Sequence, residues 1–321
     1  MNFWQQLHTP FFVLAPMEDV TDTAFRSVIA KHSKGKGGEY VTFTEFTSAD
    51  GIVFADEKGQ RKLRKKLQFE ESERPIVAQI FSATPEHIRK AADLVKELGF
   101  DGVDINMGCP DRAVEKQGAG ASLIKDPKLA QEIIYAAKEG AGCLPVSVKT
   151  RIGYEKNELS EWLPTLLETR PAAVTLHART RKELSKVPAR WELIKEAVAI
   201  RDSLCSQTLI IGNGDVQNIE HAQQLAEESE ADGVMIGRGI FGNPWGMSNY
   251  KPTLEEKLEA LIEHTKLFEK EFTGTKSFAT MRKHFSSYVE GFSGAKELRM
   301  QLMKCDMAKE VEKVIRGYQG L

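Results

Sequence analysis

Eight short apolar runs recur along the chain at fairly even intervals. They cover residues 12–17, 40–46, 76–81, 102–107, 144–152, 173–178, 208–214 and 233–238. Most are nearly continuous in valine, isoleucine, leucine and phenylalanine, which is typical of strands that are buried on both faces of a parallel sheet. The pattern therefore predicts eight buried strands.

Several of the segments between these runs carry helix signals. Residues 84–99 begin with Thr84 as a predicted N-cap and Pro85 in the first turn, and they end near Gly99. Residues 126–140 repeat this arrangement. Strand–helix units with right-handed crossovers give parallel strands, so eight units predict an α/β fold, the closed (β/α)8 TIM barrel. An open doubly wound sheet is the alternative, which the lack of a G-x-G-x-x-G motif after the first strand disfavours.

The hydrophobic pattern changes after the last of the eight runs. Residues 252–321 contain no strand-like run, whereas Leu254, Leu258 and Leu261 fall on one helical stripe. Further helices are predicted around residues 275–290, 294–303 and 305–316. We therefore predict two domains, a TIM barrel over residues 1–248 and a small all-helical domain over residues 252–321.

The composition limits the kinds of protein that this chain can be. Hydrophobic residues make up 41% of the 321 positions, which is enough for a sizeable core. No apolar run approaches the roughly 18 residues of a membrane span, and the first residues lack the basic region of a signal peptide. We therefore expect a cytoplasmic protein. The cysteines at positions 109, 143, 205 and 305 show neither metal-ligand spacing nor a disulfide pattern, so no metal is expected.

Charge adds one local signal to this picture. The formal net charge of −2 does not by itself indicate a nucleic-acid partner. Residues 61–66, however, read RKLRKK and place five cations in one short segment. Such a segment is either a solvated helix face or a patch that contacts phosphates.

Polar residues gather where the predicted strands end, and the active site of a TIM barrel lies at the carboxyl ends of its strands. Glycine-containing loops follow the last two strands, NGD at 213–215 and GRG at 237–239. Phosphate sites of barrels are commonly built in these loops from backbone N–H groups. Arg238 would add a fork-shaped donor, so we predict a phosphate site there.

Other strand-end residues have two interpretations each. Lys149 interrupts an apolar strand and needs an anion or polar ligand if it points into the barrel, unless it reaches water at the rim. His177 is either catalytic or a satisfied core histidine. Gln79 and Asn106 carry amides suited to a flat heterocycle with both donors and acceptors. Asp104, which is buried by its position, is a structural candidate.

At this point the residues match a known family. The chain resembles the tRNA-dihydrouridine synthases, flavin enzymes that reduce specific uridines in tRNA. The matching stretches are APMEDVTDTAFR, INMGCPDRAVEKQGAGASLIKDP, VSVKTRIG, TLHARTR, GNGDV and GVMIGRGIFGNPW, with MRKHFSSYVEGFSGAKELR similar to the family's helical domain. Two departures are MED where MAG is frequent, and LHART where a glycine often follows the histidine.

The resemblance implies a set of ligands and contacts. FMN would be the bound cofactor and NADPH the usual reductant, with NADH also possible. The residues implied at the flavin ring and ribityl chain are Pro16, Met17, Gln79, Lys149 and His177. Those implied at the ribityl–phosphate end are Asn213, Gly214, Asp215, Gly237 and Arg238. Those implied at the uracil are Asn106 and Arg179.

The family match also suggests a role for Cys109. Reduction of the uracil 5,6-double bond needs a hydride at C6 and a proton at C5. A thiol with an ordinary pKa of about 8.5 is protonated at neutral pH, whereas a carboxyl group is not. We predict that Cys109 is this acid; the alternatives are a small buried residue or a nucleophile, for which no partner base is evident. Gly118 and Gly120 suggest a hinged segment that closes on the extruded base.

The predicted partner is tRNA and the predicted oligomeric state is a monomer. Candidate phosphate contacts are residues 61–66, Arg282, Lys283, Lys296, Arg299 and the basic residues near the C-terminus. One rival hypothesis is a barrel flavoenzyme that acts on a small molecule, such as a dihydroorotate or dihydropyrimidine dehydrogenase, which gives no reason for the basic helical segment. Another is a tRNA-binding protein without catalysis, which the combination of Cys109, Lys149, His177 and Arg238 disfavours.

Overall fold

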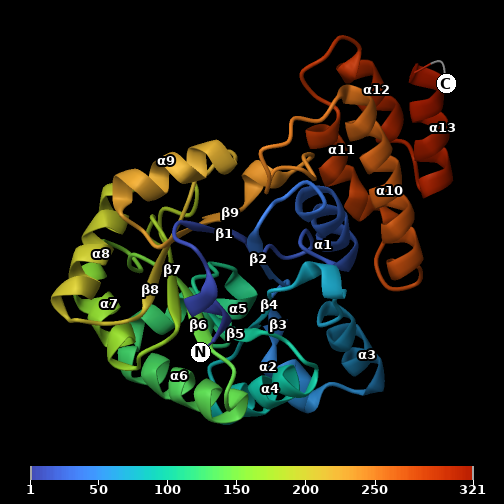
Figure 1. Ribbon diagram of the computed structural model, residues 1–321. Helices are drawn as coiled ribbons and strands as arrows, with labels where there is room; N and C mark the ends of the chain where they lie inside the picture. The colour runs from blue at the N-terminus through green and yellow to red at the C-terminus, as the bar shows by residue number, and fades with distance from the viewer. Residues whose placement is uncertain (1, 320–321) are drawn as a thin grey trace.

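A closed barrel of parallel strands forms the centre of the computed structural model, which describes residues 2–319 (Figure 1). Its strands are β1 (Phe11–Leu14), β2 (Tyr40–Phe43), β4 (Ile76–Phe81), β5 (Gly102–Met107), β6 (Val146–Arg151), β7 (Ala173–His177), β8 (Leu209–Asn213) and β9 (Gly233–Ile236). Neighbouring strands follow one another around the sheet, and a parallel pairing of β2 with β4 closes it. The predicted TIM barrel is confirmed.

The second predicted strand is divided in two. After β2 the chain breaks from the ladder and forms the two-residue β3 (Thr47–Ser48), which pairs with the last part of β4 through Thr47 and Ile80. Thr44 bridges this break, because its hydroxyl accepts a bond of 3.2 Å from the backbone N–H of Gln79. The break places Glu45, which is buried, between the two pieces of the strand.

Helices surround the barrel as the sequence pattern predicts. They are α1 (Thr23–Ile29), α2 (Ala49–Phe54), α3 (Glu57–Lys66), α4 (Pro85–Glu97), α5 (Arg112–Lys116), α6 (Pro127–Ala141), α7 (Leu159–Glu168), α8 (Glu192–Ser203) and α9 (Ile219–Ser229). Pro85 occupies the first turn of α4, and Asp126 caps α6 by accepting from the N–H of Leu129. Both helix starts are therefore confirmed, although Thr84 occupies the N-cap position of α4 without a capping hydrogen bond from its side chain.

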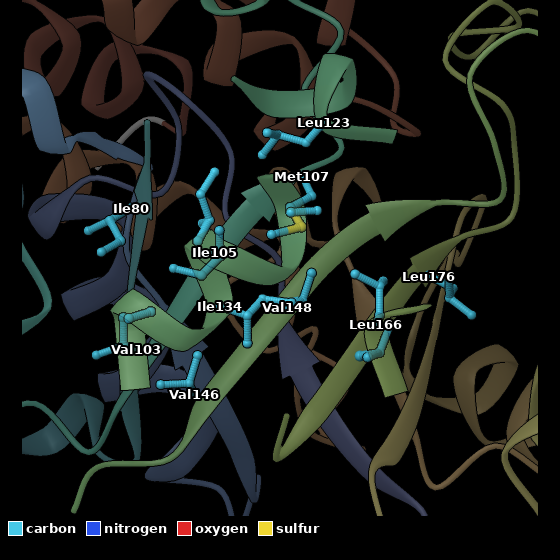
Figure 2. Packing of buried hydrophobic residues seen from close by; sticks show 14 of the residues in the cluster. Ile80, Val103, Ile105, Met107, Leu123, Ile134, Val146, Val148, Leu166 and Leu176 are labelled. Carbon is cyan, nitrogen blue, oxygen red and sulfur yellow. The ribbon is translucent and has the colours of Figure 1, made fainter. Parts of the chain in front are cut away.

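Alternate side chains of each strand point outward to the helices and inward to the barrel. Figure 2 shows the outward set, where Val103 and Ile105 of β5 and Val148 of β6 lie in one cluster with Ile134 of α6. Because these positions are buried on the helix side, the intervening residues must face the barrel interior. This alternation decides which polar side chains reach the site.

The barrel interior is apolar at one end and polar at the other. Trp4, in the 3-10 helix η1 (Phe3–Gln6), closes the amino-terminal end and packs with Phe11 and Phe43. The inward residues nearer the carboxyl ends are polar instead, among them Gln79 and Lys149. Polar groups therefore converge at the carboxyl end of the barrel.

The C-terminal part of the chain is helical, with α10 (Leu254–Phe272), α11 (Arg282–Tyr288), α12 (Ala295–Leu302) and α13 (Ala308–Gln319). These helices share a hydrophobic cluster that includes Leu258, Leu261 and Phe285. In Figure 1 they lie beside α1 on one flank of the barrel. None of the helices over residues 2–319 is long and apolar enough to cross a membrane.

Candidate active site at the carboxyl ends of the strands

A cavity of about 200 Å³ opens at the carboxyl ends of β6 to β9. Its lining residues are Ala15, Pro16, Met17, Lys149, His177, Arg179, Asn213, Gly214, Asp215, Val216, Gly237 and Arg238. The fold thus brings together all the residues predicted for the cofactor except Gln79, and it adds Arg179. They come from five strand ends that are far apart in the sequence.

Gln79 lies beneath the rim in a chain of buried hydrogen bonds. Its amide nitrogen donates to Asp104 Oδ2 at 2.7 Å, and its amide oxygen accepts from Asn106 Nδ2 at 3.0 Å. Ser147 Oγ donates to the other oxygen of Asp104 at 2.6 Å. Burial raises the pKa of Asp104 to about 6. Asp104 is thus structural, as the sequence suggested, and it holds the Gln79 amide in one orientation.

Asn106 shapes the turn that carries the cysteine. Its side-chain oxygen accepts from the backbone N–H groups of Gly108 at 3.2 Å and Cys109 at 2.9 Å. Since its amide nitrogen is bonded to Gln79, both ends of Asn106 contact protein groups. The structure therefore assigns Asn106 a positioning role, and its contact with a uracil stays a prediction.

Cys109 is half-buried among apolar side chains. It packs against the cluster of Phe81, Val114 and Ala119, and burial raises the pKa of its thiol above the ordinary value. Gly120 lies directly over this turn with a φ of +62°, and an added Cβ would come within 2.8 Å of the Cys109 carbonyl oxygen. A glycine is therefore required there, while closure of this segment on a substrate stays a prediction.

Lys149 is a cation held inside the barrel wall between Asn106 and Thr175 of the neighbouring strands. Its ammonium donates to Asn213 Oδ1 at 3.2 Å, and none of the ion pairs among residues 2–319 includes it. Burial, together with the Arg151 guanidinium, lowers the pKa of Lys149 to about 8. An ammonium in this position would be stabilised by an anionic or polar ligand.

Arg179 is buried and holds two neighbours of the pocket. Its guanidinium donates to the Val187 carbonyl at 2.6 Å, to His177 Nε2 at 3.0 Å and to Asp215. Burial, followed by the surrounding cations, lowers the pKa of His177 well below its ordinary value, so the imidazole is neutral. Because a guanidinium only donates, His177 Nε2 accepts and the ring proton lies on Nδ1. Arg179 is thus a positioning residue, and its contact with a uracil stays a prediction.

The loops after β8 and β9 present free donors. The backbone N–H groups of residues 214–216 and 237–239 have no hydrogen-bond partner within residues 2–319. The Arg238 side chain is 67% exposed, and within residues 2–319 its guanidinium makes one hydrogen bond, to Asp215 Oδ1 at 3.4 Å. Gly214 has a φ of +126°, and an added Cβ would lie 2.7 Å from Ala189 Cβ. These groups form a cradle suited to an anion such as a phosphate.

Arg151 is a positioning residue to which the sequence pattern assigned no role. Its Nε donates to the Gly108 carbonyl at 2.8 Å, and its Nη1 donates to the carbonyls of Thr180 and Leu184, both at 3.1 Å. It therefore ties the cysteine turn to the loop after β7. The sequence signal for this residue was its place at the end of an apolar strand. Its positioning role could not be predicted, because its partners lie on two other loops.

The predicted phosphate contacts are of two kinds. Within α3, Arg61, Lys62 and Arg64 are exposed, and Arg61 lies 3.9 Å from Glu57 one turn earlier. Lys66 is less exposed and pairs with Glu18. Outside α3, Lys283 and Lys296 are exposed. Arg282 instead pairs with Asp306 at 2.7 Å, and Arg299 donates to the Val289 carbonyl at 2.8 Å. The outward face of α3 therefore carries the densest group of available cations among the predicted contacts.

A closed parallel barrel with a polar, cation-rich pocket at the carboxyl ends of its strands is the architecture of a (β/α)8 enzyme. The model of the dihydrouridine synthase (Dus) family matches residues 13–319. The chain therefore belongs to the dihydrouridine synthase family, and it is an oxidoreductase.

Individual relatives agree with this assignment. The chain is 43% identical over 323 residues to the probable tRNA-dihydrouridine synthase of Staphylococcus aureus (strain MRSA252), covering 99% of this chain and 96% of that protein. It is also 43% identical to the probable tRNA-dihydrouridine synthase 2 of Bacillus subtilis (strain 168), over 99% of this chain and 97% of that protein. These matches extend through the C-terminal helices as well as the barrel.

Solved structures with a similar fold include two other enzymes. Histamine dehydrogenase from Rhizobium sp. 4-9 has a TM-score of 0.52 at 14% identity, over 80% of this chain and 48% of that chain. A 2-naphthoyl-CoA reductase has a TM-score of 0.51 at 12% identity, over 73% of this chain and 48% of that chain. At such low identity the similarity concerns the fold alone.

Proposed function

We propose that this protein is an FMN-dependent tRNA-dihydrouridine synthase that reduces the 5,6-double bond of specific uridines in tRNA with NADPH. The observation that carries the proposal is the half-buried thiol of Cys109, whose pKa is raised, on the same barrel edge as the cation-rich pocket. The names of the relatives at 43% identity support tRNA as the substrate. The protein would work as a monomer in the cytoplasm.

The pocket residues suit FMN because they offer one group for each part of it. The free N–H groups after β8 and β9, with Arg238, suit the phosphate. The Lys149 ammonium suits the acceptor edge of the ring, and Pro16 and Met17 line the same cavity. The residues that would hold the ring and ribityl chain are Pro16, Met17, Gln79, Lys149 and His177. Those that would hold the phosphate end are Asn213, Gly214, Asp215, Gly237 and Arg238.

The chemistry of the chain itself centres on one proton. When bound, FMN would supply the hydride that reaches C6 of the uracil. Cys109 gives its thiol proton to C5, so that an S–H bond breaks and a C–H bond forms, and the thiolate later regains a proton from solvent. Arg151 and Lys149 favour the thiolate state of Cys109 electrostatically, which stabilises the group that remains after proton transfer.

The target uridine must leave the stacked tRNA to reach the barrel edge, at a cost of a few kcal/mol. Phosphate contacts position the rest of the tRNA. The exposed cations of α3, namely Arg61, Lys62 and Arg64, are one surface for these contacts, and Lys296 in the helical segment is another. Asn106 and Arg179 would contact the uracil.

An anaerobic spectroscopic experiment tests the proposal. The flavin of the purified protein is reduced with NADPH, and tRNA that lacks dihydrouridine is then added while the oxidised flavin spectrum is followed. We expect rapid reoxidation by this tRNA and none by free uracil or orotate. Reoxidation by the small pyrimidines alone would assign the protein to small-molecule reduction instead, and a protein purified without any flavin would contradict the proposal entirely.

A further inference from the structure

Lys276 links the helical C-terminal segment to the rim of the barrel. It lies just after α10, and its side chain is only 18% exposed. Its ammonium is 3.4 Å from Glu45 Oε1, 3.5 Å from Asp22 Oδ2 and 3.7 Å from Asp19 Oδ1. The three carboxylates belong to the barrel edge, more than 200 positions earlier in the chain. We call these four residues the Lys276 junction.

The junction holds the loop that borders the candidate flavin pocket. This loop runs from Met17, which lines the pocket, to Asp22, which caps α1 by accepting from the N–H of Phe25. Glu45 Oε1 accepts from the backbone N–H of Asp19 at 2.7 Å. Lys276 thus contacts the cap at one end of the loop and the carboxylate that fixes its middle.

The carboxylates of the junction need this lysine as their counter-ion. Glu45 and Asp22 are 1% and 2% exposed, and within residues 2–319 Lys276 makes the one ion pair of each. Burial acts to lower the pKa of Lys276, but Glu45, Asp22 and Asp19 together raise it, so the ammonium stays charged. Burial already raises the pKa of Asp22, and Lys276 acts against this rise. Removal of the cation would therefore leave Glu45 buried without its counter-ion and would favour the neutral form of Asp22.

We propose that Lys276 is a positioning residue for the reaction, through which the helical segment sets the position of the Met17 loop. This inference rests on the proposed function, because it concerns how tRNA held by the helical segment is aligned with the pocket. Binding of tRNA phosphates does not involve the buried ammonium, so Lys276 governs the reaction of bound tRNA rather than its affinity. A misplacement of about 1 Å at a reacting centre slows chemistry by about 100-fold.

The test separates the two half-reactions in a Lys276→Met variant. We expect reduction of the flavin by NADPH to change much less than its reoxidation, and an unchanged dissociation constant for tRNA in a filter-binding assay. The rate of reoxidation at saturating tRNA should fall by about tenfold or more. Lys276→Arg keeps the charge and should recover most of this rate. Lys270→Met, at an exposed position in the last turn of α10, is the matched control.

A second variant shows whether Lys276 acts through Glu45. If it does, Lys276→Met combined with Glu45→Gln should be no slower than Lys276→Met alone, because the unpaired carboxylate has been removed. If the rate losses of the two substitutions multiply in the double variant, the inference is overturned. An unchanged reoxidation rate in Lys276→Met, or an equal loss of both half-reactions, would also overturn it. If tRNA fails to reoxidise the wild-type protein, the proposed function fails and the inference falls with it.

Discussion

At the scale of single residues, the thiol of Cys109 is the proposed general acid. Cys109 packs against Phe81 and Val114, and this burial raises its pKa. The charges of Arg151 and Lys149 act in the opposite direction but are smaller in effect. The thiol therefore keeps its proton at neutral pH until a carbon acceptor is presented, which is the property that a general acid needs.

Replacement of Cys109 by alanine tests this role directly. The variant should bind FMN and oxidise NADPH as the wild type does, because Cys109 does not line the cofactor cavity. Its reoxidation by tRNA should slow by about 100- to 10,000-fold, the usual contribution of a general acid. Cys143→Ala removes an exposed thiol and should behave as the wild type. Wild-type dihydrouridine yield from Cys109→Ala at the wild-type rate would contradict the assignment.

The same thiol predicts a pH dependence. A general acid works only while protonated, so the rate of reoxidation by saturating tRNA should stay level through neutral pH. Since the pKa of Cys109 is raised, this rate should fall only as the pH rises through that raised value, in the alkaline range. Stopped-flow measurements between pH 6 and about 10 would reveal the falling limb. The residual reoxidation rate of Cys109→Ala should not show this fall at alkaline pH. If the variant retained the fall, another group would be the source of the proton.

Motif residues and their partners differ in how far they could be predicted. Lys149, His177 and Arg238 stood out because polar groups are rare at the ends of apolar strands. The roles of Asn106 and Arg179 could not be inferred in the same way. Each donates or accepts bonds with residues on other strands, and these bonds depend on how the neighbouring strands are aligned.

At the scale of elements, the loops after β8 and β9 matter most for cofactor binding. The cradle works only if the backbone of Gly214 adopts its φ of +126°, which side-chain-bearing residues avoid. The neighbouring Ala189 also leaves no space for a Cβ at this position. Gly214 thus determines both the shape of the loop after β8 and the exposure of its backbone N–H groups.

Gly214→Ala should therefore weaken FMN binding. A strained backbone of this kind costs about 1–3 kcal/mol, equivalent to a loss of affinity of about 5- to 150-fold in a fluorescence titration of the apoprotein. Gly37→Ala is the matched control, because Gly37 also has a positive φ of +78° but has open space around it. It should carry backbone strain without loss of FMN affinity. Equal FMN affinity of wild type and Gly214→Ala would show that the cradle does not hold the cofactor.

The boundaries of elements were predicted well where local signals mark them. Pro85 and Asp126 mark the starts of α4 and α6 in the sequence itself. The division of the second predicted strand into β2 and β3 had no such signal, because it arises where β2 leaves the ladder with β1 and the chain continues along β4. The break places Glu45, which belongs to the Lys276 junction.

At the scale of the whole molecule, the distribution of charge determines how a polyanion would approach. The chain has a net charge of −2, so attraction must be local. The outward face of α3 carries exposed Arg61, Lys62 and Arg64, and Lys65 of the same helix lies 5.1 Å from the ring centre of Phe272 in α10. This basic surface therefore extends next to the helical segment.

Neutralisation of the three exposed α3 cations tests this surface. The combined change of Arg61, Lys62 and Arg64 to alanine should lower tRNA affinity and reduce the slope of log affinity against log salt by about 2–3. Reduction of the flavin by NADPH should not change. Lys195→Ala on α8, an exposed lysine elsewhere on the barrel, serves as the control. An unchanged salt slope in the triple variant would remove α3 from the tRNA surface.

The sequence by itself determined the order of the barrel strands and helices, the helical C-terminal segment and most of the strand-end residues that line the candidate pocket. These follow from local signals: continuous apolar runs, helix starts such as Pro85, and glycines such as Gly214. Only the tertiary structure decided which partners these residues have. The contacts of Arg179 with Asp215 and of Lys276 with Glu45 join positions 36 and 231 apart. Barrel closure and the packing of the helical segment create these pairs, and no local pattern encodes either.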